Sequence, residues 1–501
     1  MSEKGGSLTT TLWAVKFVFE QPCCFAHMFT LADLKKLKDA GSLDARTASL
    51  LAMAVADLVI SQYRDKNVYS RDAVALLCEI TSNEDPEIAR AVAAVLFADL
   101  IERLSDSFNP DFCPLYDRIF AQVIDFYRHL SIELDKGLNR FGLLDEADLL
   151  DRKYQIHKPR IHKSQISNLN SIKKAVFLSR VTIGADVAVT SVIIAKLREL
   201  LPNAEFVLLG SRKLMDLFDG DMSLKIREIA YERSGTVISR LNSWLDLLGV
   251  IEDEQRGLNP DEFWLIDPDS RLSQLGMLPL IKDEKNYFFF DSRSYQHPGA
   301  SRLGELAWLW VNETFGSEGP AFPFVALPAE RQLFGRAITE RLRGAGASNI
   351  ITVSLGTGGN PRKRLNDSFE EELIYGLLKR STLILDKGAT EEEREQINRI
   401  ARNLRKEGRT IVEVTEQNAQ QMLKEDVRQT DLLTWDGGIG AFAALIAASD
   451  QYVGYDSAGQ HIAAALGVPT KTIFVNSGSQ TFAERWRPYG PGVIEVIDAR
   501  C

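Results

Sequence analysis

The sequence predicts an α/β protein in which two Rossmann-like domains follow an all-α region. Apolar residues recur at helical spacing up to about residue 134, and strand-like and helix-like segments alternate from residue 173 onward. A chain of 501 residues is also too long for a single core. We therefore expect an N-terminal helical domain at residues 1–160 and Rossmann-like domains at residues 161–345 and 346–501.

Composition argues against several classes of protein. The net charge of −10 argues against a nucleic-acid binder, which usually carries a basic face. No apolar run reaches the roughly 18 residues that a transmembrane helix needs. The five cysteines show no metal-ligand spacing, and their odd number does not indicate a disulfide framework. We expect a protein without a metal centre, in the reducing cytoplasm.

The N-terminal region predicts helices at residues 31–38, 43–63, 71–80, 86–104 and 114–134. Asp85 is a plausible N-cap, because Pro86 suits the first helical turn that follows it. The simplest interpretation is a helical bundle packed on the next domain, and the alternative is a module that binds a protein partner. Residues 151–171 are polar and basic, which predicts a linker.

From residue 173 the pattern becomes α/β. Residues 174–179 predict a strand, residues 187–200 a helix and residues 204–209 the next strand, which together make a βαβ unit. The turn of this unit holds Asp186, near the start of the helix. A structural aspartate here would cap the helix or offset its dipole. A functional one would act as a general base at the mouth of a ligand site.

Further along, residues 263–266 and 287–290 predict buried strands, and residues 304–315 and 330–343 predict helices. A strand at residues 349–355 then leads into a glycine-rich turn. Gly358 and Gly359 let the backbone approach an anion closely, and Lys363 could neutralise a diphosphate. The order of residues is not that of a Walker loop, and a turn of this composition is more often purely structural.

Residues 451–475 are the most informative stretch. Residues 451–455 predict a strand, residues 456–459 a polar turn, residues 460–466 a helix and residues 470–475 a second strand. The turn therefore lies at the carboxyl end of a strand, where open α/β sheets bind ligands. The free N–H groups of the helix start would suit a phosphate.

This stretch resembles glycosyltransferase family 9, which includes ADP-heptose:lipopolysaccharide heptosyltransferases. The family pattern D-S-G-x-x-H-x-A-A-A-x-G-x-P is similar to Asp456, Ser457, His461, Ala463, Ala464, Ala465, Gly467 and Pro469. A G-D element before an apolar and threonine run resembles Gly184, Asp186 and residues 187–190. The family's glycine turn with its lysine resembles Gly358, Gly359 and Lys363. The resemblance covers roughly residues 173–210 and 349–498.

The resemblance implies the GT-B architecture, in which two Rossmann-like domains face a cleft. Residues 346–501 would bind the nucleotide sugar, and residues 161–345 would face the acceptor. The implied reaction is an inverting transfer of a heptose or hexose from a nucleotide-diphosphate sugar, with ADP favoured, to a glycan, lipid or protein hydroxyl. It would need no metal and no other cofactor. The implied location is cytoplasmic or peripheral to the inner membrane.

The resemblance also implies roles for single residues. Asp186 would deprotonate the acceptor, while Lys363 and the helix start would stabilise the leaving diphosphate. Asp456 would cap the helix or hold a ribose or sugar hydroxyl. The donor-binding residues would be Gly358, Gly359, Lys363, Asp456, Ser457, Ala458, Gly459 and His461. One alternative is a GT-B-fold protein that binds a nucleotide sugar or a partner without transfer, and a less favoured one is a nucleotide-sugar epimerase.

The sequence departs from the family pattern in four places. Ala458 replaces a glycine, which would strain the chain if that position needs a positive φ. Ala185 is an extra residue between Gly184 and Asp186. Residues 365–366 replace the Trp-Pro that often follows the lysine, and the usual C-terminal helix that packs toward the other domain is not evident.

Overall fold

The structure is a computed structural model that describes residues 30–39, 43–157, 169–358, 363–422, 429–475 and 479–499. The chain divides into two compact units. The first contains residues 1–158, 230–253 and 272–282, and the second contains residues 159–229, 254–271 and 283–501.

The first unit is helical in its described part. Its elements are α2 (Leu31–Asp39), α3 (Ala45–Lys66), α4 (Arg71–Thr81), α5 (Pro86–Val95), η2 (Leu96–Glu102), α6 (Arg103–Ser105), η3 (Pro110–Phe112), α7 (Cys113–Arg128), α8 (Ile132–Asn139), α9 (Glu146–His157) and most of α13 (Val237–Gln255). Asp85 caps α5 as predicted, since its side chain accepts a hydrogen bond of 2.8 Å from the backbone N–H of Glu87.

Two predictions for this unit are wrong. The helix predicted at residues 114–134 ends at Arg128, and a new helix begins after Ser131, whose side chain caps it. The predicted linker is helical up to His157, and residues 158–168 lie outside the described part of the chain. Arg152 and Lys153 are buried there, because their side chains donate hydrogen bonds to the carbonyl groups of residues 275–277.

The helix α13 was not predicted. It buries the ring of Trp244, whose Nε1 donates a hydrogen bond of 2.7 Å to the carbonyl oxygen of Pro279. Through α13 and residues 272–282, part of the middle of the sequence belongs to the helical unit. The boundaries proposed near residues 160 and 345 stay predictions.

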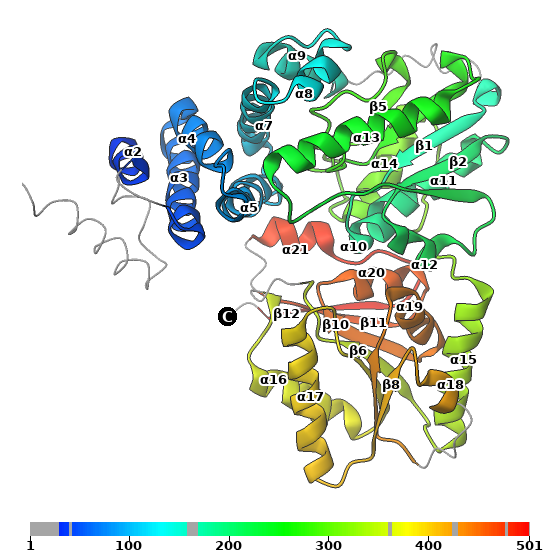
Figure 1. The fold of residues 1–501 in the computed structure, drawn as a ribbon. Coiled ribbons are helices and arrows are strands. Elements are labelled where there is room, and N and C mark those ends of the chain that lie inside the picture. Colours follow the sequence, from blue (N-terminus) through cyan, green and yellow to red (C-terminus); the bar gives the residue numbers. More distant parts are fainter. Residues whose placement is uncertain are drawn as a thin grey trace, which may run out of the picture. The chain divides into compact units, whose positions relative to one another are not determined.

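The second unit contains two parallel sheets, which confirm the predicted α/β class with an extra N-terminal helical region (Figure 1). The first sheet has the strand order β3-β2-β1-β4-β5. Its strands are β1 (Lys174–Leu178), β2 (Glu205–Gly210), β3 (Leu224–Glu228), β4 (Phe263–Asp267) and β5 (Tyr287–Phe289). The helical elements beside it are α10 (Ile183–Ala185), η5 (Asp186–Thr190), α11 (Ser191–Leu200), η6 (Arg212–Leu214), α12 (Met215–Phe218) and α14 (Leu303–Phe315).

The second sheet has the strand order β12-β11-β10-β6-β7-β9-β8, and all of its pairs are parallel. Its strands are β6 (Ile350–Ser354), β7 (Thr382–Asp386), β8 (Ile411–Thr415), β9 (Leu432–Asp436), β10 (Gln451–Tyr455), β11 (Thr470–Phe474) and β12 (Ile494–Asp498). The helices around it are α15 (Ala329–Gly344), α16 (Asp367–Leu378), α17 (Glu391–Lys406), α18 (Ala419–Met422), α19 (Ile439–Ala448), α20 (Ala458–Ala465) and α21 (Gln480–Trp486).

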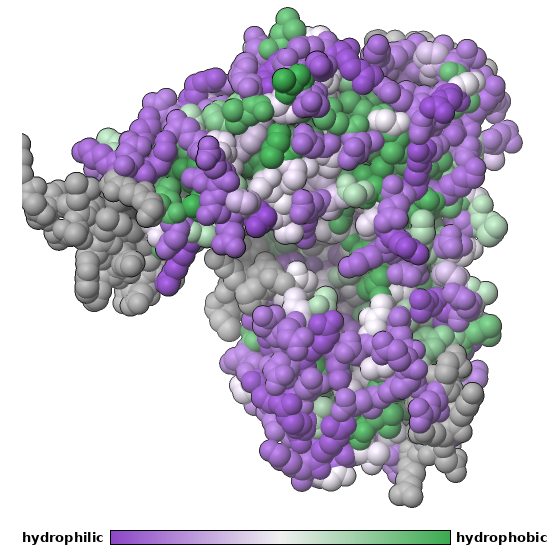
Figure 2. Space-filling model, in the orientation of Figure 1, coloured by the Kyte–Doolittle hydropathy of each residue, from purple (hydrophilic) through white to green (hydrophobic). Residues whose placement is uncertain are grey.

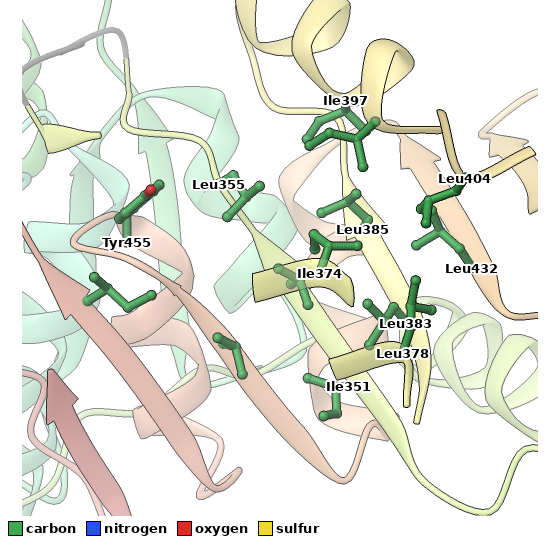
Figure 3. Close-up of a cluster of buried hydrophobic side chains, with 14 of the residues drawn as sticks. Ile351, Leu355, Ile374, Leu378, Leu383, Leu385, Ile397, Leu404, Leu432 and Tyr455 are labelled. Atoms are coloured by element: carbon green, nitrogen blue, oxygen red, sulfur yellow. The ribbon is translucent and has the colours of Figure 1, made fainter. Parts of the chain in front are cut away.

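Alternate residues of these strands build a core against α16 and α17 (Figure 3). Ile351 and Val353 of β6 pack there with Ile374 of α16 and with Ile397 and Leu404 of α17. The outer surface of this domain beside α16 and α17 is hydrophilic (Figure 2). The apolar face of α17 therefore packs against the sheet, as expected for an amphipathic helix. Among the described residues, no helix is both long enough and apolar enough to cross a membrane.

Candidate functional site

Each sheet has a topological switch point, and the predicted site residues follow the strands that flank it. In the second sheet β6 and β10 are neighbours, and the chain leaves them toward opposite edges. The corresponding neighbours in the first sheet are β1 and β4. Open α/β sheets bind ligands outside the carboxyl ends of such strands. The segments after β6, β10 and β1 contain Lys363, Asp456 and Asp186, respectively.

Lys363 and Asp456 form an ion pair at the second switch point. The Nζ atom of Lys363 lies 2.6 Å from Oδ2 of Asp456 and 3.4 Å from its backbone carbonyl oxygen. The other carboxylate oxygen of Asp456 accepts a hydrogen bond of 2.6 Å from Nε2 of Gln460. Asp456 therefore holds the lysine ammonium beside the start of α20.

The start of α20 has ordinary helical geometry. Ser457 occupies the N-cap position with an extended backbone, and Ala458 is the first helical residue. Because Ala458 does not adopt a positive φ, alanine replaces the family's glycine there without strain. Glycine is required at Gly459 for space instead, since a Cβ atom there would lie 2.2 Å from the hydroxyl oxygen of Tyr452.

The residues that directly follow Lys363 are held in place by hydrogen bonds to buried side chains. The guanidinium of Arg364 donates to both carboxylate oxygens of the buried Glu370, at 2.9 and 2.7 Å. The hydroxyl of Tyr455 donates to Glu370 at 3.1 Å and accepts from the backbone N–H of Leu365 at 3.2 Å. These bonds fix the backbone next to Lys363. Asn366 caps α16, which gives that departure from the family pattern a structural role. Gly358 precedes the turn with a φ of +65°, and Gly359 lies outside the described residues.

His461 is a buried neutral imidazole. Burial lowers its pKa to about 4, and the nearby Asp456 carboxylate opposes that effect only in part. Gln460 directs its amide nitrogen toward the Asp456 carboxylate, which can only accept. The same nitrogen lies 3.2 Å from Nε2 of His461.

Asp186 is also buried, with 1% of its surface exposed. Its carboxylate accepts hydrogen bonds from the hydroxyl of Ser179 at 2.6 Å, from the backbone N–H of Arg180 at 2.7 Å and from the hydroxyl of Thr190 at 2.9 Å. Burial raises the pKa of Asp186 to about 6, and these hydrogen bonds act in the opposite direction. The carboxylate is therefore ionised at neutral pH but close to its titration range.

The extra residue Ala185 is accommodated by a change in helix type. Residues Asp186–Thr190 form a π-helical turn between α10 and α11. A π-turn holds one more residue than the α-helical turn it replaces, and such turns are frequent at functional sites. The insertion is thus absorbed in the helix, while Asp186 stays near its start.

The structure brings the two switch points together through α10 and α20. A Cβ atom added to Gly184 would lie 3.1 Å from Cα of Ala458 and 3.3 Å from Cδ2 of His461. Glycine at residue 184 thus favours this close approach of the segment that carries Asp186 to the helix that follows Asp456, because a side chain there would make a tight contact. Three neighbours of the predicted residues were missed by the sequence analysis: Gln460, Phe482 and Trp486. Gln460 lies within the family pattern, but at one of its unspecified positions.

A second buried carboxyl group was also missed. Asp386 ends β7, and burial raises its pKa to about 7. Ser354, at the end of β6, donates a hydrogen bond of 3.2 Å to it. Within the described ranges, His, Cys, Asp and Glu side chains do not form a group of three that could hold a metal ion.

Comparisons with known proteins point to one family. Residues 348–500 match the family described as glycosyltransferase family 9 (heptosyltransferase). No curated protein matches the chain. A solved structure of a glycosyl transferase family 9 protein from Veillonella parvula DSM 2008 is 14% identical, with a TM-score of 0.46 over 66% of this chain and 87% of that one. E. coli heptosyltransferase WaaC with ADP is 14% identical, with a TM-score of 0.44 over 65% of this chain and 93% of that one.

The matched residues contain both partners of the ion pair, the whole of α20 and the anchored turn after β6. This chain carries a glycosyltransferase family 9 domain at residues 348–500, and by that domain it is a glycosyltransferase.

Proposed function

We propose that the chain transfers a heptose or hexose from a nucleotide-diphosphate sugar to a hydroxyl group of a glycan, lipid or protein, with inversion and without a metal ion. The observation that carries this proposal is the Lys363–Asp456 pair at the start of α20. The ammonium group and the free backbone N–H groups of residues 458–460 would share the charge of the leaving diphosphate. ADP is the favoured nucleotide, because the resemblance is to a family that includes ADP-heptose transferases.

In this proposal Asp186 is the general base. A carboxylate has about four lone-pair positions, and three are occupied by Ser179, Arg180 and Thr190. One position is left for an acceptor hydroxyl, which would lose its proton as it attacks the anomeric carbon from the side opposite the diphosphate. A pKa of about 6 suits a base that works near neutral pH. Gly358, Gly359, Ser457, Ala458, Gly459 and His461 would complete the donor site.

A second candidate is a protein that binds a nucleotide sugar without transferring it. It is favoured by the burial of Asp186, because all three of its hydrogen bonds come from its own β1–α11 segment. That arrangement is also what a purely structural aspartate would show.

One experiment separates the two candidates. Thermal shifts with ADP-, UDP-, GDP- and dTDP-sugars identify the nucleotide, because a ligand of the native state raises its apparent stability. Release of the nucleotide from the chosen sugar, with the sugar passing to an added glycan hydroxyl or to water, is then measured for the wild type and for Asp186→Asn. We expect Asp186→Asn to lose at least about 100-fold in turnover while its thermal shift with the nucleotide persists.

The matched control is Glu254→Gln, which changes a carboxylate that accepts from Lys174 at the amino end of β1 and from Arg227 of β3, at 2.8 and 2.6 Å. It is expected to keep turnover. Equal turnover of Asp186→Asn and the wild type refutes the base role, and binding without any turnover in the wild type supports the second candidate. Loss of turnover in EDTA that Mg²⁺ restores contradicts metal independence.

A further inference from the structure

The helix α21 contacts residues from both halves of the candidate site. It follows β11 and precedes β12, and the side chain of Ser479 caps its start. Phe482 and Trp486 are four residues apart on it, so they lie on one face, with ring centroids 6.4 Å apart. These two aromatic side chains reach different parts of the site.

Phe482 lies next to the proposed phosphate-binding cation. The Nζ atom of Lys363 is 5.3 Å from the centre of the Phe482 ring, within the range of a cation–π interaction. Together with Asp456, this ring limits where the ammonium group can lie. Phe482 therefore acts on the half of the site that would hold the diphosphate.

Trp486 lies next to α20 and also next to the half of the site that contains Asp186. Its ring is 5.9 Å from the ring of His461 and 5.9 Å from the guanidinium carbon of Arg180. Its backbone oxygen accepts a hydrogen bond of 3.4 Å from Nε2 of Gln460, the residue that holds Asp456. The backbone N–H of Arg180 is in turn one of the three donors to Asp186.

The C-terminal end of α21 and the residues just after it are fixed by three contacts. Nη1 of Arg485 donates a hydrogen bond of 3.0 Å to the carbonyl oxygen of Tyr295, beyond the end of β5. Just after the helix, the hydroxyl of Tyr489 accepts from Nε1 of Trp308 of α14 at 3.1 Å. On the side of the second sheet, a Cβ atom at Gly490 would lie 2.0 Å from the carbonyl oxygen of Ala464 of α20. The segment formed by α21 and the residues just after it therefore contacts elements beside both sheets.

We propose that α21 is a positioning element for transfer in which Phe482 holds Lys363 for the donor diphosphate and Trp486 holds Arg180, and through it Asp186, against the α20 half. This inference rests on the proposed function. Neither aromatic ring takes part in the chemistry of the transfer. The two side chains should then affect different kinetic quantities, which a general loss of folding would not do.

The test uses the full chain with ADP as the binding probe, ADP-heptose as the donor and a glycan hydroxyl or water as the acceptor of the heptose. Phe482→Leu is expected to weaken ADP binding about two- to fivefold, the size of an exposed cation–π contact, with kcat for ADP release within a factor of two. Trp486→Leu is expected to lower kcat about tenfold or more with ADP affinity unchanged, because it misplaces the base and not the phosphate site. Trp486→Phe keeps a ring beside Arg180 and should restore most of kcat.

The control is Trp310→Leu, which removes an indole that packs on Phe290 and Phe315 away from α21. The acid limb of the kcat–pH profile is recorded for each variant, since a shift in Trp486→Leu but not in Trp310→Leu ties the loss to Asp186. If both tryptophan variants lose kcat alike, or if Trp486→Leu loses ADP affinity as much as kcat, the positioning role is overturned. A wild type that binds a nucleotide but releases none from any of the ADP-, UDP-, GDP- and dTDP-sugars overturns the proposed function itself, and this inference with it.

Discussion

The ammonium group of Lys363 is held by Asp456, whose second carboxylate oxygen is held by Gln460. Gln460 is fully buried, and its amide oxygen accepts a hydrogen bond from Thr472 of β11. The cation at the start of α20 is thus positioned by groups that reach into the sheet. A positioned charge needs little reorganisation when the diphosphate leaves, which is the condition for effective electrostatic stabilisation.

Replacing the cation tests this role directly. Lys363→Met keeps the apolar stem and removes the charge, so ADP should bind about 10- to 100-fold more weakly, the equivalent of one charged hydrogen bond. Calorimetric titration with ADP measures the loss. Lys471→Met is the control, because Lys471 pairs with Glu495 at 3.0 Å at the other end of the sheet. Equal affinities for Lys363→Met and the wild type would exclude Lys363 from the donor site.

Restoring the family's glycine at residue 458 should bring no benefit. Ala458 is helical and has a negative φ, so Ala458→Gly is expected to lower the free energy of unfolding by up to about 1 kcal/mol through backbone entropy. ADP affinity should not change. Urea denaturation and ADP titration measure the two quantities, and a gain in either one would show that alanine is strained after all.

The sequence predicted the strands that flank the switch points, because buried parallel strands are short apolar runs that end in turns. It also singled out Lys363, Asp456 and His461 through short local motifs and the family resemblance, and their donor-binding roles stay predictions. It did not predict Gln460 and Trp486 as partners, because Trp486 lies 26 residues from Gln460 along the chain. The π-turn after Ala185 and the burial of Arg152 and Lys153 depend on tertiary packing in the same way. Residue patterns record local periodicity, and these features arise from contacts between distant segments.

The hydrogen bonds of the Tyr455 hydroxyl, which hold the backbone next to Lys363, should contribute measurably to the free energy of unfolding. Tyr455→Phe leaves the N–H of Leu365 and one oxygen of the buried Glu370 without their partner hydroxyl. We expect a loss of about 1–3 kcal/mol in the free energy of unfolding, together with weaker ADP binding. Tyr375→Phe is the matched control, since it removes a tyrosine–glutamate bond of 2.6 Å to the exposed Glu407, and should cost less than about 0.5 kcal/mol. Equal losses in the two variants would contradict this contribution of the Tyr455 hydroxyl.

The buried Asp186 should make stability depend on pH in a particular direction. Its folded-state pKa of about 6 lies above the ordinary value of 3.8, so the native state binds the proton more tightly and stability falls as pH rises through this range. Asp186→Asn lacks this dependence. Relative to the wild type, its free energy of unfolding should therefore increase by about 3 kcal/mol between pH 4 and pH 7. Urea denaturation at several pH values measures the difference, and a flat difference would contradict the raised pKa.

His461 should make the free energy of unfolding depend on pH in the opposite direction. Its folded-state pKa of about 4 lies below the ordinary value of 6.5, so its contribution to stability is present above pH 6.5 and is lost as pH falls through 4. His461→Gln keeps a polar side chain next to Gln460 and cannot be protonated, so relative to the wild type its free energy of unfolding should rise by about 3 kcal/mol as pH falls from 7 to 4. His129→Gln, at an exposed histidine, is the control, and its free energy of unfolding should change with pH as that of the wild type does. Because the Asp186 and His461 effects have opposite signs, the two difference profiles should have opposite slopes between pH 4 and pH 7, and two slopes of the same sign would show that at least one of the groups is not buried as described.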